Sequence, residues 1–229
     1  NRVPDHRSGE PLKPLQPMGR SVTALWLVPE QRGWPTGVTL SAEELGWARS
    51  MAAGREGQFG RSRAWMRCCL ADLFDLDPAA VPLQAAPGVP PTLPIGWGCL
   101  SLSHCRDAVA VVWSDRAVGI DVERSDRNFP AAALATRYYS APDQHALKPL
   151  AGEALRQAVL RQWVAKEALI KLTQGSLALD LGRWICGSDD DVAHHPSLAT
   201  PVPVRRYEWD AWVVAVAGVR GQISPICLI

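Results

Sequence analysis

The run AVAVVW (residues 108–113) and the run AVGIDV (residues 117–122) carry the densest strand signal in the chain. Both are rich in valine, isoleucine or aromatic residues, which fit a pleated and half-buried surface. Ser114, Asp115 and Arg116 lie between them, a length and a chemistry that suit a tight turn. The two runs therefore predict an antiparallel hairpin near the midpoint of the chain.

Outward from this hairpin, strand and helix signals mix without a strict alternation. Ser41 and Glu44 form a capping-box sequence that predicts a helix start. The periodicity of apolar residues predicts helices over residues 61–74 and 153–172 and strands over residues 22–28 and 209–217. Proline-rich stretches at residues 78–94 and 196–203 predict loops. Because strands and helices do not follow a β-α-β order, the predicted fold class is α+β.

Composition indicates an ordinary globular protein. Of the 229 residues, 47% are apolar and 21% are charged, which leaves enough apolar material for a core. Lysine plus arginine number 24 against 23 acids, so the net charge of +1 is too balanced for a nucleic-acid coat or a polybasic membrane binder. The longest apolar run, residues 211–219, is far shorter than the roughly 20 residues that cross a bilayer. We expect no nucleic-acid partner and no membrane insertion.

The start of the chain and the cysteines bear on cellular location. Residues 1–20 hold four prolines and no apolar segment, so we expect an extended or disordered leader and not a secretory signal. Six cysteines without a C-x-x-C pair indicate neither a disulfide scaffold nor a zinc site, and free thiols are typical of a reducing cytosol. We therefore expect a cytoplasmic protein.

Two carboxylates lie side by side in the second strand-like run. Alternate residues of a strand share a face, so Asp121 and Glu123 point one way while Ile120 and Val122 point the other. Like charges at such positions repel, which requires a nearby cation or full exposure to water. The pair is a candidate metal or catalytic site, and a solvated strand end is the alternative.

A helical motif, a strand end and an arginine cluster supply the other candidates. In WVAKEALIK (residues 163–171), Glu167 and Lys171 share a helix face, an arrangement that also forms ordinary surface ion pairs. In SLSH (residues 101–104), Ser103 and His104 end a strand. Five arginines face only one acid between residues 49 and 67, which suits phosphate recognition, although a solvated helix face fits equally. These arginines are Arg49, Arg55, Arg61, Arg63 and Arg67.

Taken in chain order, the motifs SH, GIDVE and WVAKEALIK resemble the signature of the phosphopantetheinyl transferase superfamily, in particular its larger, monomeric Sfp-type branch. The spacings from His104 to Asp121 and from Asp121 to Glu167 are usual for that branch. Weaker likeness extends to LSAEE near Ser41, SRAWMR from Ser62 and RYYSAPD from Arg137. The resemblance covers most of the chain after the leader.

The resemblance implies two similar α+β halves in one monomeric chain, residues 21–118 and 119–229, with the active site at their junction. It implies transfer of the phosphopantetheine moiety of coenzyme A to a serine of an apo acyl- or peptidyl-carrier protein, with release of adenosine 3′,5′-bisphosphate. Such reactions serve fatty-acid, polyketide or nonribosomal-peptide synthesis, and the sequence does not distinguish among them.

Residue roles follow from the same resemblance. Asp121, Glu123 and Glu167 would hold Mg²⁺, whose preferred ligands are oxygens. Glu167 would also accept the serine proton, directly or through water. Lys171 would stabilise the leaving phosphate.

The resemblance also places the 3′-phosphate of coenzyme A at Ser103 and His104, near three arginines of the first half, Arg55, Arg63 and Arg67. The family usually has Gly-Lys-Pro ahead of the Ser-His pair, but Gly88-Val89-Pro90 stands there in this chain and lacks the lysine. Residues 129–147 would face the carrier protein, and Tyr138 and Tyr139 within them fit either surface or core.

Two other functions compete with this interpretation. A Mg²⁺-dependent phosphodiesterase or nuclease also uses closely spaced acids followed by a glutamate and a lysine. The net charge of +1 and the lack of a basic, aromatic groove argue against it. A coenzyme A-binding module without turnover is the non-enzymatic alternative, which the intact acids and Lys171 disfavour and Val89 leaves open.

Overall fold

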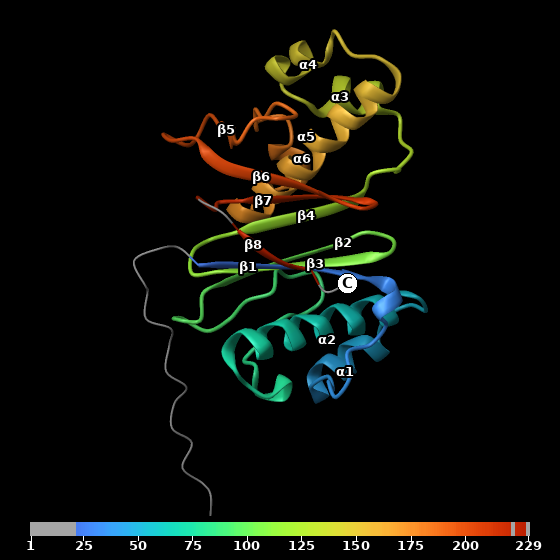
Figure 1. Cartoon of the computed structure of the whole chain (residues 1–229), viewed down its shortest axis with the longest axis vertical. Helices are drawn as coiled ribbons and strands as arrows, with labels where there is room; N and C mark the ends of the chain where they lie inside the picture. The colour runs from blue at the N-terminus through green and yellow to red at the C-terminus, as the bar shows by residue number, and fades with distance from the viewer. Residues whose placement is uncertain (1–21, 221–222, 228–229) are drawn as a thin grey trace, which may run out of the picture.

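Helices and strands form four stacked layers in the computed structural model, which describes residues 22–220 and 223–227 (Figure 1). The predicted leader, residues 1–20, lies outside the described residues. In chain order the elements are β1 (Thr23–Pro29), the 3-10 helix η1 (Glu30–Arg32), α1 (Ala42–Arg49), α2 (Arg55–Phe74), the 3-10 helix η2 (Pro78–Ala80), β2 (Cys99–His104), β3 (Ala108–Ser114), β4 (Gly119–Arg124), α3 (Ala131–Tyr138), α4 (Ala141–Leu147), α5 (Gly152–Thr173), α6 (Leu177–Asp180), β5 (Val192–Ala193), β6 (Val202–Trp209), β7 (Trp212–Ala217) and β8 (Ser224–Cys227). The predicted α+β class is confirmed.

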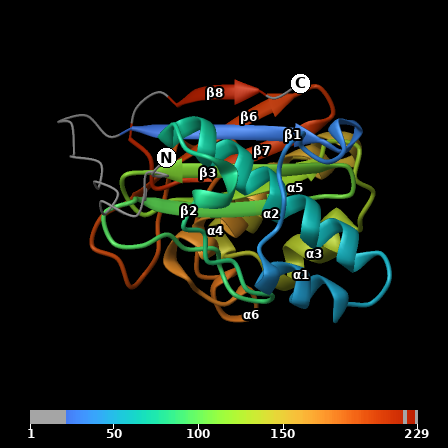
Figure 2. The same cartoon turned by 90° about the horizontal axis from the view of Figure 1, so that it is seen from below.

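The two inner layers are four-stranded sheets, with strand orders β2-β3-β1-β8 and β4-β7-β6-β5. Neighbouring strands are antiparallel except β1 and β8, which are parallel. In Figure 1, α1 and α2 cover the outer side of the first sheet, and α5 lies on the outer side of the second. Figure 2 shows α2 crossing in front of the strands of the first sheet. Each sheet therefore has its own helical cover.

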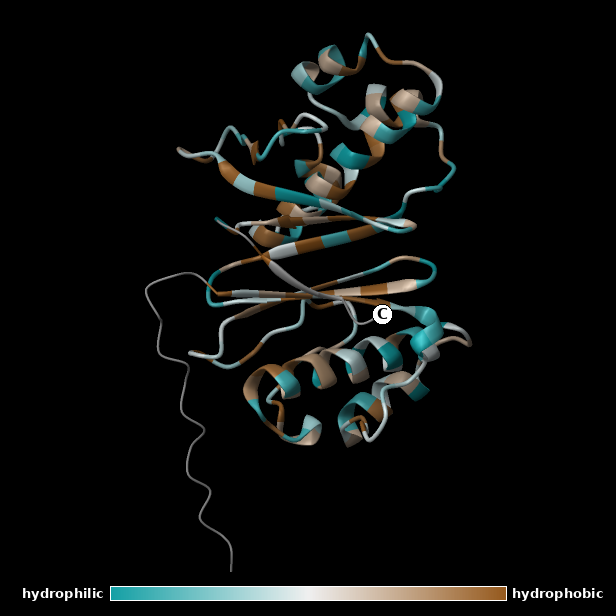
Figure 3. Ribbon diagram, viewed as in Figure 1, coloured by the Kyte–Doolittle hydropathy of each residue, from teal (hydrophilic) through white to brown (hydrophobic). Residues whose placement is uncertain are grey.

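Apolar cores fill the spaces between these layers. Met66 and Leu70 of α2 pack with the outer face of the first sheet. Leu25, Val112 and Ile120 belong to the core between the two sheets. A further core joins α5 to the second sheet. Figure 3 shows brown, hydrophobic segments along the strands, with teal interruptions in β4, the strand that carries the predicted acids.

The predicted hairpin between residues 108–113 and 117–122 is wrong. Both runs are strands, but β3 pairs with β1 and β2, whereas β4 pairs with β7. The chain therefore crosses from the first sheet to the second, and apolar residues of β3 and β4 meet in the core between the sheets. A short polar connection fits a hairpin and a crossover between packed sheets equally well, because the deciding partners, β1 and β7, are distant in sequence.

Several element ends also differ from the sequence prediction. α2 begins at Arg55 and not at residue 61, because its first turn, REGQ, has no apolar periodicity. The predicted strand 209–217 contains the end of β6 and all of β7, which are joined at Asp210, a turn residue with φ of 48°. The predicted loop 196–203 runs into β6. The short helices α3 and α4 are not among the elements predicted from the sequence. The capping box at Ser41, in contrast, is confirmed in both of its hydrogen bonds.

The chain returns to its first sheet after it has formed the second. β8, near the C-terminus, pairs with β1 and so completes the first sheet. The division of the chain at residues 118 and 119 stays a prediction, because one strand from the second part belongs to the first sheet. Among the helices of the described residues, none combines the length and apolar character that crossing a membrane requires.

Candidate functional site

β4 and α5 approach each other closely at Gly119. A Cβ atom at this position would lie 2.0 Å from the carbonyl oxygen of Ala168, so glycine permits a contact that other residues would prevent. The first residue of GIDVE thus has a packing role. Because α5 lies directly on β4, the two acids of β4 face the KEALIK motif near the end of α5.

Asp121 is the buried centre of this contact. Its side chain is 4% exposed, and its Oδ1 accepts hydrogen bonds from Lys171 Nζ at 2.8 Å and Ser103 Oγ at 2.6 Å. Lys171 Nζ also lies 2.9 Å from Ser103 Oγ. β2, β4 and α5 therefore each contribute one side chain to a single cluster. A solvated strand end does not describe Asp121, and the ionic partner of Lys171 is Asp121.

Glu123 and Glu167 flank this centre, and their surroundings disfavour the ionised form of both carboxyls. Burial, and then the charge of Asp121, raises the pKa of each carboxyl to about 7. Arg127 and Lys171 oppose this rise in both cases. A carboxyl group that titrates near neutral pH can accept a proton in its ionised form, as a general base does, and the repulsion among the three acids would decrease if a cation bound between them.

The three acids offer oxygen ligands suited to a hard cation, but they do not form a complete metal site as they stand. Asp121 Oδ2 is buried and has no hydrogen-bond partner among the described residues, an unfavourable state for a carboxylate oxygen unless a ligand binds it. Within the same residues, no three acidic, histidine or cysteine side chains are close enough to hold a metal ion as they stand. Mg²⁺ commonly takes only one or two carboxylates, with waters and substrate phosphates as its other ligands, so Asp121, Glu123 and Glu167 remain a suitable set.

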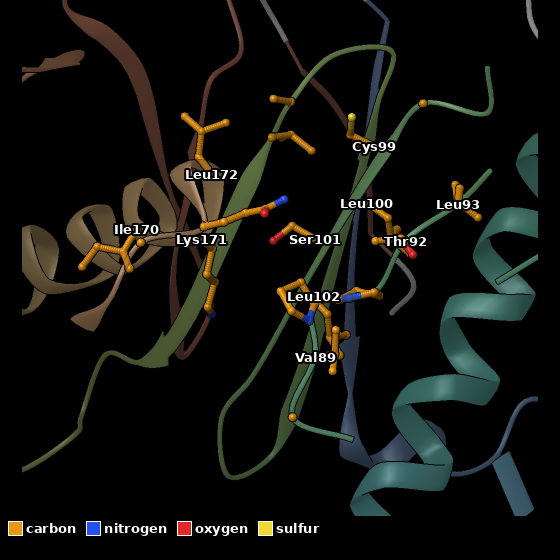
Figure 4. A pocket seen from close by; sticks show the side chains of 18 of the residues that line it. Val89, Thr92, Leu93, Cys99, Leu100, Ser101, Leu102, Ile170, Lys171 and Leu172 are labelled. Atoms are coloured by element: carbon orange, nitrogen blue, oxygen red, sulfur yellow. The ribbon is translucent and has the colours of Figure 1, made fainter. Parts of the chain in front are cut away.

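Two adjoining cavities lie beside the cluster. The first, of about 730 Å³, is lined by Lys171 of α5, by Ser101 and Leu102 of β2, and by Val89. Figure 4 shows Val89, Thr92 and Leu93 on one side of this cavity and Ile170, Lys171 and Leu172 on the other, with Ser101 and Leu102 between them. The cavity is thus bounded by β2 of the first sheet, by the loop that precedes it, by the connection that leads into β4 and by the end of α5.

The second cavity, of about 630 Å³, carries three of the predicted phosphate contacts: Arg55, Arg63 and His104. It shares Arg63 and Gly88 with the first cavity, so the two cavities adjoin each other at these residues. Burial lowers the pKa of Arg63 to about 10, and its guanidinium donates to the carbonyl oxygen of Ala85. Partial burial, and the charges of Lys171 and Arg63, lower the pKa of His104.

Two predicted phosphate contacts are not placed with these residues. Arg67 is 5% exposed, pairs with Glu44 through Nε at 3.0 Å and donates to two backbone carbonyl oxygens. Its guanidinium therefore has a structural role in the packing of α2. Ser103 is a bridge between Asp121 and Lys171 and belongs to the acidic cluster.

Three residues that the sequence interpretation missed also belong here. Gln58 lies 3.4 Å from His104 Nδ1 and lines the second cavity. Ser101 Oγ accepts from the backbone N–H of Ile120, and its spacing of two from Ser103 was a usable signal for a shared strand face. Arg127 donates to Glu123 from beyond the end of β4, where no periodicity links the two positions.

The segment predicted to face the carrier protein contains α3 and α4. Tyr139 is buried and donates to the carbonyl oxygen of Val159, whereas Tyr138 is 40% exposed, so one tyrosine is core and the other surface. Asp143 pairs with the fully buried Lys166 at 2.6 Å. This ion pair fastens α4 to α5.

Comparison with known proteins matches this region to one family. Residues 117–219, which include both acids of β4 and the KEALIK motif, match the family model described as the 4′-phosphopantetheinyl transferase superfamily. A curated relative, the 4′-phosphopantetheinyl transferase HetI of Nostoc sp. (strain PCC 7120), is 26% identical over 164 residues. The alignment covers 67% of this chain and 69% of HetI.

Proposed function

Residues 117–219 match the 4′-phosphopantetheinyl transferase superfamily, and on that premise we propose that the chain is a member that catalyses a Mg²⁺-dependent reaction with coenzyme A as donor. The family supports phosphopantetheine transfer to carrier proteins in general. We propose in addition that the acceptor is a serine of an apo acyl- or peptidyl-carrier protein and that adenosine 3′,5′-bisphosphate is released. The observation that carries this proposal is the unpartnered Oδ2 of Asp121, buried beside Lys171 and the two flanking acids.

Asp121, Glu123 and Glu167 would hold the Mg²⁺ ion together with the pyrophosphate of coenzyme A. When bound, Mg²⁺ withdraws negative charge from the phosphorus under attack. The unpartnered oxygen and the raised pKa values of the two glutamates support this assignment, because all three oxygen groups gain from a nearby cation.

Glu167 is the proposed general base. The serine hydroxyl loses its proton to the Glu167 carboxylate as its oxygen attacks the phosphorus that bears the pantetheine arm. A new serine O–P bond forms, and the P–O bond to adenosine 3′,5′-bisphosphate breaks. The pKa of about 7 supports this role, because a base that titrates near the working pH is both available and able to take the proton.

Lys171 is the proposed electrostatic partner of the leaving phosphate. Its side chain is 32% exposed and lines the first cavity, so its ammonium group is accessible to a substrate while still paired with Asp121. Negative charge grows on the leaving phosphate as the P–O bond breaks, and a cation held nearby stabilises that charge.

We propose that coenzyme A occupies the two adjoining cavities. Arg55, Arg63 and His104 would bind its 3′-phosphate in the second cavity, and Lys171 would meet the pyrophosphate in the first. Arg63 and Gly88 line both cavities, which supports a single ligand that extends across them. The monomeric state, the cytoplasmic location and the absence of a nucleic-acid partner stay predictions from the sequence.

A direct test combines the protein with Mg²⁺, coenzyme A and a panel of apo acyl- and peptidyl-carrier proteins, followed by mass spectrometry of the intact carriers. We expect one phosphopantetheine addition to the serine of at least one carrier, and none when a chelator is in excess. Full activity in excess chelator would refute the metal assignment. Absence of modification across the panel, with coenzyme A bound, would favour a binding module without turnover.

A further inference from the structure

Arg127 supplies a second cation to the acidic cluster, beside Lys171. Its Nη1 donates to Glu123 Oε1, and its side chain is 39% exposed against 21% for Glu123. The guanidinium carbon lies 5.7 Å from the ring centre of Phe129 and 5.9 Å from that of Trp163, within the range of a cation–π contact. Arg156 donates to the backbone carbonyl of Arg127 at 2.8 Å. Arg127 is thus held in place from several sides.

The cluster is therefore paired internally before any ligand binds. Lys171 neutralises Asp121, and Arg127 neutralises Glu123. The charges of both cations also act on Glu167. Three carboxylates face two cations, so a divalent ion that enters must compete with Lys171 for Asp121 and with Arg127 for Glu123.

When the metal binds Glu123, Arg127 loses its ionic partner and needs another anion. An arginine released from Glu123 near a bound pyrophosphate has such an anion available, because guanidinium groups pair well with phosphate oxygens. Without coenzyme A, the other carboxylates at the cluster in the described structure, Asp121 and Glu167, are ones that the metal also uses. The free energy of metal binding must then include the loss of the Arg127–Glu123 ion pair.

We propose that Arg127 forms an ion pair with Glu123 in the absence of ligand and so competes with Mg²⁺ for this carboxylate. The competition makes the binding of Mg²⁺ and of coenzyme A mutually dependent. The inference rests on the proposed function, since it assumes that coenzyme A is the anionic ligand. Linkage requires the effect to be reciprocal: each ligand increases the affinity of the other by the same factor.

The test is a calorimetric titration of Mg²⁺ into the full chain, with and without saturating coenzyme A and with no carrier protein present. Three variants accompany the wild type. Arg127→Gln removes the charge, and Arg127→Lys retains it. Arg205→Gln removes a matched arginine on β6, which is 38% exposed and pairs with Asp191 at 2.7 Å.

We expect Arg127→Gln to bind Mg²⁺ alone about five- to tenfold more tightly than the wild type, on the scale of one partly exposed charge near a divalent ion. Coenzyme A should then increase Mg²⁺ affinity by a correspondingly smaller factor. Arg127→Lys should stay close to the wild type, and Arg205→Gln should match it. Circular dichroism of each variant verifies that the fold is kept.

Two results would overturn the inference. One is an unchanged Mg²⁺ affinity in Arg127→Gln, and the other is an equal change in Arg205→Gln. Failure of the proposed function has a different signature: coenzyme A would not bind the wild type at all, while the competition between Arg127 and Mg²⁺ would still be measured without it.

Discussion

Helix α5 carries two lysines, five positions apart, that pair with aspartates in opposite surroundings. Lys166 is 0% exposed, and its Nζ donates to Asp143 Oδ2 and to the carbonyl oxygens of Leu181 and Trp184. The second oxygen of Asp143 accepts from the backbone N–H of Cys186 at 3.0 Å. Lys171 is about a third exposed, and its partner Asp121 keeps one oxygen without a hydrogen bond in the described structure.

The difference between the two pairs separates a structural role from a functional one. A buried ion pair whose remaining polar atoms are all satisfied holds elements together and leaves nothing for a ligand. A buried carboxylate with an unpartnered oxygen is costly by itself and becomes favourable only when a ligand completes it. The same pair of residue types therefore fastens α4 to α5 at one point and prepares a binding site at the other.

The largest expected effect comes from removing charge at the incomplete pair. Asp121→Asn keeps the shape of the side chain and removes its charge. We expect kcat to fall at least a thousandfold, about 4 kcal/mol in the activation free energy, with little change in stability. Asp143→Asn is the matched control and should lose stability while its folded fraction keeps turning over. Near wild-type turnover in Asp121→Asn would remove Asp121 from the mechanism.

The second test removes the lysine of each ion pair in turn. Lys166→Met leaves Asp143 buried without its ionic partner and should lower the free energy of unfolding by about 3 kcal/mol, measured by urea denaturation. Lys171→Met should cost less, about 1 kcal/mol, because Lys171 is a third exposed and the buried Asp121 keeps its hydrogen bond from Ser103. Its main effect should be a lower kcat with little change in KM. Equal losses of stability in the two variants would contradict the assignment of a structural role to Lys166 and a functional role to Lys171.

The third test uses pH on the metal-free protein. The folded-state pKa values of Glu123 and Glu167, about 7, lie above the unfolded values near 4.5, so the folded protein binds more protons between these limits. The free energy of unfolding should therefore fall as pH rises from about 5 to 7.5, by about 2 kcal/mol in total after allowance for partial exposure.

Glu123→Gln/Glu167→Gln is the control for that titration, and its stability should depend less on pH over the same interval. Thermal denaturation at fixed ionic strength measures both proteins. A wild-type protein whose stability rises over this interval, or a double variant with the same profile, would show that the surroundings do not raise the pKa values of the two carboxyls.

The smallest expected effect concerns the cavity beside Lys171. Val89 is 58% exposed and lines the first cavity next to Gly88, which both cavities share. Val89→Lys should tighten coenzyme A binding by about 1 kcal/mol, and dephospho-coenzyme A should gain nothing. His104→Ala should weaken coenzyme A more than its dephosphorylated analogue. Equal effects on the two ligands in calorimetric titrations would refute the placement of the 3′-phosphate.

Local signals in the sequence were reliable wherever one segment decides its own structure. The capping box at Ser41 formed as predicted, and the helix predicted over residues 153–172 is α5. The alternation that put Asp121 and Glu123 on one face was also sufficient, because strand geometry alone decides it.

Pairing between distant segments was not accessible in this way. The alternation in β3 and β4 is the same for a hairpin as for two strands in different sheets, and only the pairing of β3 with β1 and of β4 with β7 distinguishes them. The roles of the arginines show the same limit. Arg63 and Arg67 are one turn apart on α2, yet Arg63 lines the cavities and Arg67 is held by Glu44.

The sequence by itself determined the α+β class, the family resemblance and the acids and lysine of the candidate site, since these depend on residue types and short spacings. Only the tertiary structure decided which lysine of α5 completes a core and which borders a cavity, and that Arg127 pairs with Glu123. Those outcomes depend on which groups from β2, α4 and the chain beyond β4 come within hydrogen-bond distance. Burial and charge then act on each group according to those neighbours, and no local pattern encodes them.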